Sequence, residues 1–168
     1  MPVVPVVNSF YSIHPGEWYF GDEYERLHTV LGSCVALTAW HPVLKLGGMC
    51  HFLLASEPVQ SKREGALRQG VTGDCRYAIH ALAQMKRAML AYADVAEYQL
   101  GLFGGGDMFS FRASTSIGQD NIAYACQWLR REKLQPTQTD VGGHISRSLM
   151  LLIPTGEVHL KHYQMNQL

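Results

Sequence analysis

The sequence lacks an excess of charge of either sign, and it lacks a long apolar run. Fourteen Lys and Arg residues balance fourteen Asp and Glu residues, so no net field directs the chain toward nucleic acid phosphates or an anionic membrane surface. The apolar stretch 141–154 is interrupted by His144 and Arg147, and it is shorter than the roughly 20 residues that cross a bilayer. These absences argue against nucleic-acid binding and against membrane insertion.

The beginning of the chain has no basic segment, and prolines at positions 2 and 5 interrupt its apolar residues. A secretory signal would need a basic start followed by an unbroken apolar run. We therefore expect a cytoplasmic protein.

Closely spaced cysteine pairs are also missing. The four cysteines stand at positions 34, 50, 75 and 126, and a chain of this size does not need disulfides to fold. A zinc site would require cysteine or histidine ligands in tight pairs, and the neighbours Cys50 and His51 would point to opposite faces of a strand. The sequence therefore predicts free thiols, no metal site and no cofactor.

The pattern of apolar residues predicts a mixed structure. The length favours a single domain over 1–168, with 1–27 partly irregular. Period-two apolar runs predict strands, and apolar residues at intervals of three and four predict helices. The predicted strands are 30–40, 46–54, 99–103, 138–141, 148–153 and 157–160; the predicted helices are 74–92, capped by Asp74 or Thr72, and 117–133; residues 57–70 are a predicted surface loop. This order predicts an α/β or α+β fold, a layered single domain with two main helices packed on a mixed sheet.

The first two predicted strands bracket a turn that contains His41 and Pro42, which indicates a hairpin. With a loop at 41–44, Trp40 pairs with Lys45 and Cys34 lies directly opposite His51. Directly opposed Cβ atoms lie about 5 Å apart on one face of a sheet. A different loop length or a bulge would change this register.

A thiol beside an imidazole can attack a carboxamide. The histidine takes the thiol proton and later protonates the leaving ammonia, while backbone N–H groups stabilise the oxyanion. Cys34 and His51 supply the first two parts, and a neighbouring imidazolium would raise the fraction of thiolate. The amides around Gly32, Ser33 and Cys34 are the candidate oxyanion donors, because glycine lets a substrate approach the backbone closely.

Each of these residues also has a purely structural interpretation. A single cysteine in an apolar strand is usually a small buried hydrophobe, and a histidine in a strand is usually a hydrogen-bonded polar group. The run Gly104-Gly105-Gly106 matches no phosphate-binding pattern, so a tight turn is favoured there. Residue type alone does not select among these alternatives.

Five segments together resemble the CheD family of chemoreceptor glutamine deamidases. Leu31-Gly32-Ser33-Cys34-Val35-Ala36-Leu37 is similar to the family's nucleophile segment, and Gly47-Gly48-Met49-Cys50-His51-Phe52-Leu53-Leu54 is similar to its histidine segment. A glycine-rich block at 102–109 and the segments 117–121 and 140–143 resemble the rest of the family pattern. The resemblance runs in the expected order over about 28–160.

The resemblance implies a cysteine-dependent enzyme that converts selected glutamines of methyl-accepting chemotaxis receptors to glutamates. It assigns the nucleophile to Cys34, the base to His51 and the hydroxyl that orients the histidine to Thr29. Ser33 and Ser56, which the resemblance does not assign, are lesser candidates for that hydroxyl. It also implies a layered α/β fold and often a complex with a CheC-type phosphatase. The alternatives are a non-catalytic chemotaxis module that binds such a phosphatase or a receptor, and a cysteine peptidase, which lacks a carboxylate or amide partner for His51.

Overall fold

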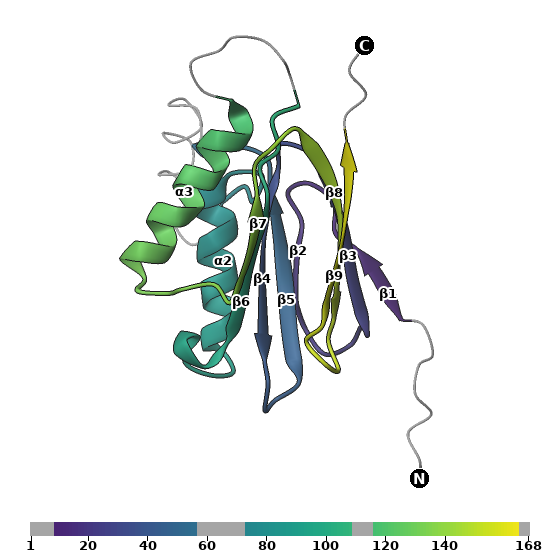
Figure 1. The fold of residues 1–168 in the computed structure, drawn as a ribbon. Helices are drawn as coiled ribbons and strands as arrows, with labels where there is room; N and C mark the ends of the chain where they lie inside the picture. Colours follow the sequence, from purple (N-terminus) through teal and green to yellow (C-terminus); the bar gives the residue numbers. More distant parts are fainter. Residues whose placement is uncertain (1–8, 57–72, 109–115, 165–168) are drawn as a thin grey trace.

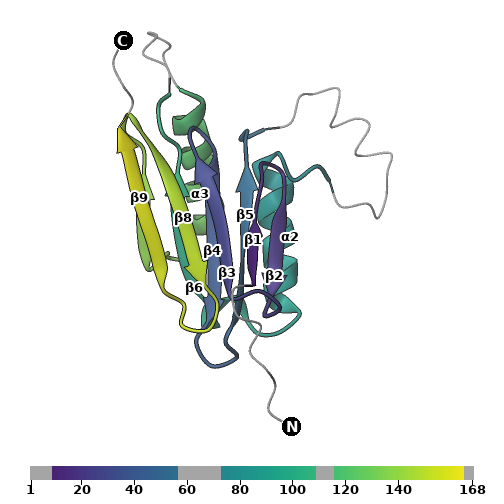
Figure 2. The ribbon, with the colours of Figure 1, turned by 90° about the vertical axis from the view of Figure 1, so that its right-hand side faces the viewer.

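The protein is layered: two β-sheets pack face to face, and a layer of helices covers the outer face of one of them (Figures 1 and 2). The computed structural model describes residues 9–56, 73–108 and 116–164. Within these residues one sheet has four strands in the order β1-β3-β8-β9, and the other has five in the order β2-β5-β4-β6-β7. The elements are β1 (Phe10–Ser12), β2 (Trp18–Gly21), β3 (Arg26–Leu31), β4 (Val35–His41), β5 (Leu46–Phe52), α2 (Ala78–Leu90), the short helix η1 (Val95–Glu97), β6 (Gln99–Gly104), α3 (Ile117–Arg131), β7 (Gln138–Val141), β8 (Ile145–Leu152) and β9 (Val158–Gln164). The predicted α+β class, with helices packed on a mixed sheet, is confirmed.

Two apolar layers hold the protein together. One lies between the helices and the five-stranded sheet, with Leu82 and Met85 of α2 against Phe52 of β5. The other lies between the two sheets and contains Leu27 and Leu149. Every residue of β4 and β5 is buried, because one face of these strands contacts helices and the other contacts a sheet. This sandwiching explains their nearly continuous apolar sequences.

The helices begin for different physical reasons. Ser116 caps α3 in a capping box, in which its hydroxyl accepts from the N–H of Gln119 and the Gln119 side chain accepts from the N–H of Ser116. No side chain caps α2, whose first flanking residue is Tyr77, so the predicted cap at Asp74 is wrong. Asp74 instead accepts hydrogen bonds from the backbone and the guanidinium of Arg76. The other candidate cap, Thr72, and the predicted loop 57–70 lie outside the described residues.

The predicted hairpin exists, but its predicted register is wrong. β4 and β5 are antiparallel, with Trp40 opposite Gly47 and Ala36 opposite His51. The turn occupies 42–45, where Lys45 has a φ of 56° and donates its N–H to the carbonyl of His41. His41 Nδ1 also accepts from the N–H groups at 43 and 44. These bonds extend the pairing to His41 and move Cys34 away from the position opposite His51.

Residues 30–40 do not form one strand as predicted. β3 ends at Leu31 in the four-stranded sheet, and β4 begins at Val35 in the five-stranded sheet. Gly32, Ser33 and Cys34 therefore form a crossover between the sheets. The apolar pattern continues through this point because both strands face the same layer between the sheets.

The remaining strands agree with the sequence in position but differ in extent. β8 begins earlier than predicted and β9 ends later, and Gly156, with a φ of 76°, lies in the turn between them. In the stretch 1–27, predicted to be partly irregular, residues 9–27 contain the short strands β1 and β2 and the start of β3. No helix of the described residues is long and apolar enough to span a membrane.

Candidate active site

Cys34 lies at the crossover between the sheets, and hydrogen bonds hold the three carbonyls of this segment. The Gly32 carbonyl accepts from the N–H of Gly106 at 2.9 Å, and the Cys34 carbonyl accepts from the N–H of Gly105 at 2.8 Å. The Ser33 carbonyl accepts from the side-chain amide of Asn121 at 3.0 Å. Gly32, Ser33 and Cys34 are all partly exposed. The segment is thus rigidly anchored while remaining open to solvent.

The glycine run 104–106 is what lets these two segments approach. Gly104 has a φ of 106°, and a Cβ atom there would lie 2.2 Å from the Cys34 carbonyl oxygen. Gly105 has a φ of 69°, in the left-handed region that favours glycine. A tight turn was predicted for Gly104 to Gly106; instead Gly104 is the last residue of β6 and Gly105 and Gly106 continue as irregular backbone, and the N–H groups of Gly105 and Gly106 bind the cysteine segment.

His51 is the second-last residue of β5 and points into the layer between the sheets. Its side chain is on the same face as that of Ala36, which is directly opposite, and Cys34 is two residues from Ala36 along the chain. Cys34 itself lies one residue before β4, so the strand register does not fix its position relative to His51; its side chain packs against the apolar cluster between the sheets, the layer into which His51 points. Among the described residues, no hydrogen bond is made by His51 Nε2, so the structure does not join it to the Cys34 thiol.

Thr29 and His51 come from different sheets and meet between them. The Thr29 hydroxyl oxygen lies 2.7 Å from His51 Nδ1 and 2.6 Å from the carbonyl oxygen of Ile13. A carbonyl can only accept, so the single hydroxyl proton goes to Ile13 and the hydroxyl oxygen accepts from Nδ1–H. This arrangement fixes the tautomer of His51 with its proton on Nδ1. Nε2 is left with a free lone pair, as a general base requires.

In a single regular strand, Thr29 and Cys34, five positions apart, would point to opposite faces, but Thr29 lies in β3 and Cys34 lies after its end. Thr29 is an inward residue of β3, and Cys34 precedes the first residue of β4. The other hydroxyl candidates have different environments. Ser33 is in the crossover itself, and Ser56 lies at the end of the described segment 9–56.

Burial keeps both candidate groups neutral. It lowers the pKa of His51 to about 4, with the Ile13 carbonyl acting in the opposite direction, and it raises the pKa of the Cys34 thiol. The expected imidazolium that would favour the thiolate is therefore not the state of the free protein. The resting pair is a neutral thiol and a neutral imidazole.

The other cysteines differ from Cys34 in surroundings. Cys50 is fully buried on the opposite face of β5, toward the helices, and burial raises its pKa to about 12. Cys75 is also buried, and Cys126 is partly buried on α3. All four thiols are free, as predicted. No group of three or more His, Cys, Asp or Glu side chains suited to a metal ion occurs in the described part of the chain.

Comparison with known proteins decides the family. The family model described as CheD chemotactic sensory transduction matches residues 61–162. The chain belongs to the CheD family. The matched range begins after the hairpin that carries Cys34 and His51, so the family model alone does not cover those residues.

Full-length relatives extend the CheD similarity over the hairpin. The chain is 37% identical to a Pseudomonas fluorescens protein over 98% of its own length and 90% of the relative's. It is 38% identical to a Pseudomonas syringae pv. tomato protein, covering 88% of this chain and 86% of the relative. A third, from Chromobacterium violaceum, is 35% identical over 90% of this chain and 77% of the relative. The relatives are named probable chemoreceptor glutamine deamidases.

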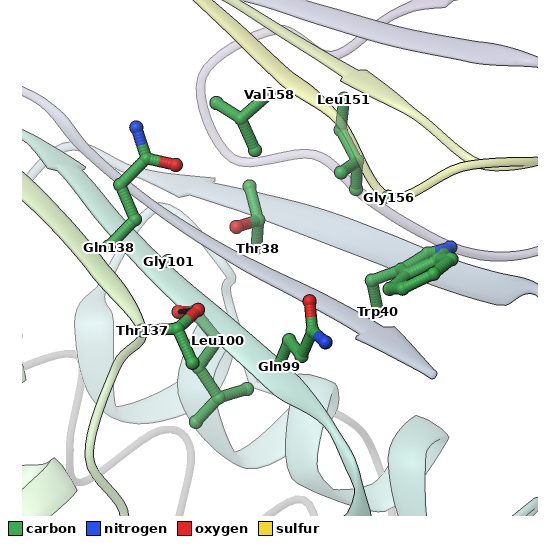
Figure 3. Close-up of a pocket in the computed structure, with 10 residues that line it drawn as sticks. All are labelled: Thr38, Trp40, Gln99, Leu100, Gly101, Thr137, Gln138, Leu151, Gly156 and Val158. Atoms are coloured by element: carbon green, nitrogen blue, oxygen red, sulfur yellow. Dashed lines mark hydrogen bonds between the residues drawn. The ribbon is translucent and has the colours of Figure 1, made fainter. Parts of the chain in front are cut away.

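A pocket of about 80 Å³ opens elsewhere between the sheets (Figure 3). Thr38 lies on the same face of β4 as Ala36, and the pocket is bounded beyond it by Trp40 and by Gln99 of β6. No cysteine, histidine or charged residue lines it. The pocket therefore lacks a thiol and a residue that could act as a general base, and it is separate from the site around Cys34.

Two residues that contact the site were not identified from the sequence. Asn121 was noted only as part of a segment that resembles the family, and Arg147 only as an interruption of an apolar run. Arg147 is 2% exposed; it donates to Asp140 Oδ1 at 2.8 Å and to the carbonyls of Gly104 and Gly142. A charged residue within an apolar strand pattern, as Arg147 is, indicates a buried charge that must be paired or hydrogen-bonded inside the protein.

Proposed function

We propose that this CheD-family chain is a protein-glutamine deamidase that acts on the cytoplasmic domain of chemotaxis receptors, with Cys34 as nucleophile. The observation that carries the proposal is the hydrogen-bonded pair of Thr29 and His51, which leaves Nε2 unprotonated in the layer between the sheets, against which the partly exposed Cys34 packs. The names of the curated relatives supply the reaction and the substrate class.

In the proposed reaction, His51 Nε2 accepts the Cys34 proton while the sulfur attacks the side-chain carbonyl carbon of a glutamine. The C–N bond then breaks, ammonia leaves with the proton returned by His51, and a thioester remains. Water attacks the thioester, its proton passes to His51, and the thiolate leaves and is reprotonated. The net change is a glutamine and a water converted to a glutamate and ammonia.

The neutral resting pair implies that substrate binding activates the thiol. Catalytic hydrogen bonds are often long in free enzymes and shorten in the substrate complex. We propose that a bound glutamine segment covers the crossover and brings Sγ and Nε2 together. A thiol that stays protonated without substrate is also protected from oxidation, because the thiolate is the reactive form.

Ser33 and Cys34 are the proposed oxyanion donors. In the described part of the chain, the backbone N–H groups of Gly32, Ser33 and Cys34 donate to no backbone carbonyl, although the carbonyls of the same segment are all bound; the Cys34 N–H contacts the thiol of its own residue. Free N–H groups on a fixed backbone next to a nucleophile are suited to stabilise a developing negative charge.

The location and partners follow from the same proposal. A receptor's cytoplasmic domain places the enzyme in the cytoplasm, and a CheC-type phosphatase is the proposed regulatory partner. No observation on the described residues favours the non-catalytic module, and no carboxylate or amide binds His51 as in a cysteine peptidase of that type.

The test is intact-mass analysis of a receptor cytoplasmic fragment incubated with the protein. Wild type should add the mass difference between an acid and an amide for each glutamine converted. Cys34→Ala should abolish this gain without unfolding the protein, and His51→Ala should be nearly as damaging because the two residues act as one unit. Cys126→Ala is the matched control, since it removes a partly buried thiol from α3. Full activity in Cys34→Ala would exclude the nucleophile.

A further inference from the structure

Asn121 is a fully buried polar residue whose side chain reaches the cysteine segment from a helix. It is 0% exposed, and its amide donates to the carbonyls of Ser33 at 3.0 Å and Leu53 at 2.8 Å. Figure 1 shows the first turns of α3 at the end of the sheet where β4 begins and β5 ends. One side chain therefore links the residue before Cys34 to the chain that follows His51.

The donors of this side chain, not its acceptor, determine its orientation. Asn121 Oδ1 is buried and has no hydrogen-bond partner among the described residues. The reversed orientation would place Oδ1 against two carbonyl oxygens and would lose both bonds. Burying an unpaired acceptor costs about 1–3 kcal/mol. The unpaired Oδ1 of Asn121 therefore lowers the free energy of unfolding of the protein.

Peptide geometry connects this bond to the reaction. The C=O of Ser33 and the N–H of Cys34 belong to one planar trans peptide, so they point in opposite directions. A hydrogen bond that holds the Ser33 carbonyl toward α3 therefore aims the Cys34 N–H away from α3, and within the described residues this N–H donates to no backbone carbonyl and contacts only the thiol of Cys34 itself.

We infer that Asn121 is a positioning residue: by holding the Ser33 carbonyl, it aims the Cys34 N–H at the oxyanion formed when the thiol attacks the glutamine. The inference rests on the proposed deamidase function. It assigns Asn121 no contact with the substrate, since the side chain is completely buried, and it separates orientation of the oxyanion donor from activation of the thiol.

The test compares two reactions of the same thiol. Deamidation of a receptor cytoplasmic fragment passes through an oxyanion, whereas alkylation of Cys34 by iodoacetamide at alkaline pH displaces iodide and forms none. Asn121→Ala should lower kcat for deamidation by about 10- to 100-fold. This fall is at most comparable to the fall in kcat of about 10²–10³ that follows removal of a whole oxyanion donor. KM and the rate of alkylation, measured by peptide mapping, should stay within about 3-fold, since neither depends on the oxyanion.

Two further variants keep the test decisive. Asn121→Asp has nearly the same shape but no amide donor, so it should reproduce the kcat loss if the alanine variant does not fold. Leu129→Ala removes a buried side chain from the same helix and is the stability-matched control; it should leave kcat within about 3-fold at temperatures below its own unfolding.

The outcomes separate the inference from the function on which it rests. Absence of deamidation by wild type would overturn the proposed function. Active wild type with Asn121 variants no worse than Leu129→Ala would overturn the inference alone. A parallel fall of alkylation and deamidation would also overturn it, because Asn121 would then hold the thiol and not the oxyanion donor.

Discussion

At the scale of single residues, the most informative contact is the one between Thr29 and His51. Its two short hydrogen bonds determine which nitrogen of the imidazole carries the proton. A histidine with the other tautomer would present an N–H to the thiol and could not accept its proton. The contribution of Thr29 is therefore one of orientation and tautomer choice, which a substitution of the same shape can test.

Thr29→Val should lower kcat by about 10- to 100-fold. This is part of the roughly 10²–10⁴-fold rate acceleration that a positioned general base supplies. Substrate binding should change little, because valine keeps the shape of threonine and Thr29 is 2% exposed. Thr29→Ser, which restores the hydroxyl, should recover most of the rate. Steady-state assays on a receptor fragment give kcat and KM separately.

The matched control for this prediction is Thr38→Val. Thr38 is another buried threonine on a strand that faces the same layer, but within the described residues no hydrogen bond joins it to His51. It should keep kcat near wild type. Wild-type turnover in Thr29→Val, or an equal loss in Thr38→Val, would return Thr29 to a purely structural role.

At the scale of elements, the sequence predicted which segments are strands and helices better than how they pair. The apolar runs located β4, β5, β6 and both helices of the described residues, because burial leaves a periodic pattern. The pattern does not record which sheet a strand joins, so 30–40 was interpreted as one strand. It also does not record the turn geometry of Lys45, which changed the hairpin register.

The candidate site was predictable in part for the same reason. Cys34 and His51 were identified as a pair through a hairpin that exists, yet Ala36, and not Cys34, lies opposite His51. Contacts between sheets, such as that of Thr29 with His51, are not determined by spacing along the chain. Resemblance to the CheD family selected Thr29, whereas the partners from α3 and β8 became evident only in three dimensions.

Gly118 determines how closely α3 approaches the glycine run 104–106. A Cβ atom at this position would lie 2.4 Å from the Gly105 carbonyl oxygen and 2.5 Å from that of Gly106. Alanine would gain about 1 kcal/mol of helix propensity over glycine, but overpacking against a backbone costs about 1–3 kcal/mol. Because the contacting atoms are backbone, either the helix or the glycine run must move.

We therefore expect Gly118→Ala to lower kcat by about 10-fold or more, because it displaces the N–H groups that hold the carbonyls of Gly32 and Cys34. The thermal midpoint should not rise. Ala125→Val adds volume to the buried face of the same helix away from the glycine run, and it should affect stability without a comparable loss of kcat. A more stable and fully active Gly118→Ala would show that the close approach is unimportant.

At the scale of the whole molecule, the candidate site lies where the two sheets exchange the chain. Polar side chains bridge the sheets at this end: Thr29 reaches His51, and Arg147 reaches Asp140 and the carbonyls of Gly104 and Gly142. Burial of His51 affects both the chemistry of the site and the stability of the protein. It keeps the imidazole neutral, and it makes protonation of the folded state unfavourable.

The consequence is a specific loss of stability in acid. Unfolding restores the pKa of His51 from about 4 to its ordinary value of 6.5. Above pH 6.5 the residue is neutral in both states and has no effect. Between about 6.5 and 4 only the unfolded state is protonated, so this residue lowers the free energy of unfolding by about 1.4 kcal/mol per pH unit, on the order of 3 kcal/mol in total.

His51→Gln should remove this dependence, since glutamine has the same capacity to bond to Thr29 and does not titrate in this range. Urea unfolding of both proteins at several pH values between 7 and about 4 gives the measurement, and the difference between their free energies cancels the titration of every other group. The difference should be constant above pH 6.5, should shift in favour of the variant as the pH falls, and should level off near the folded pKa. A difference that stays flat over the whole range would mean that His51 is protonated in the folded protein, and the neutral resting pair would then be wrong.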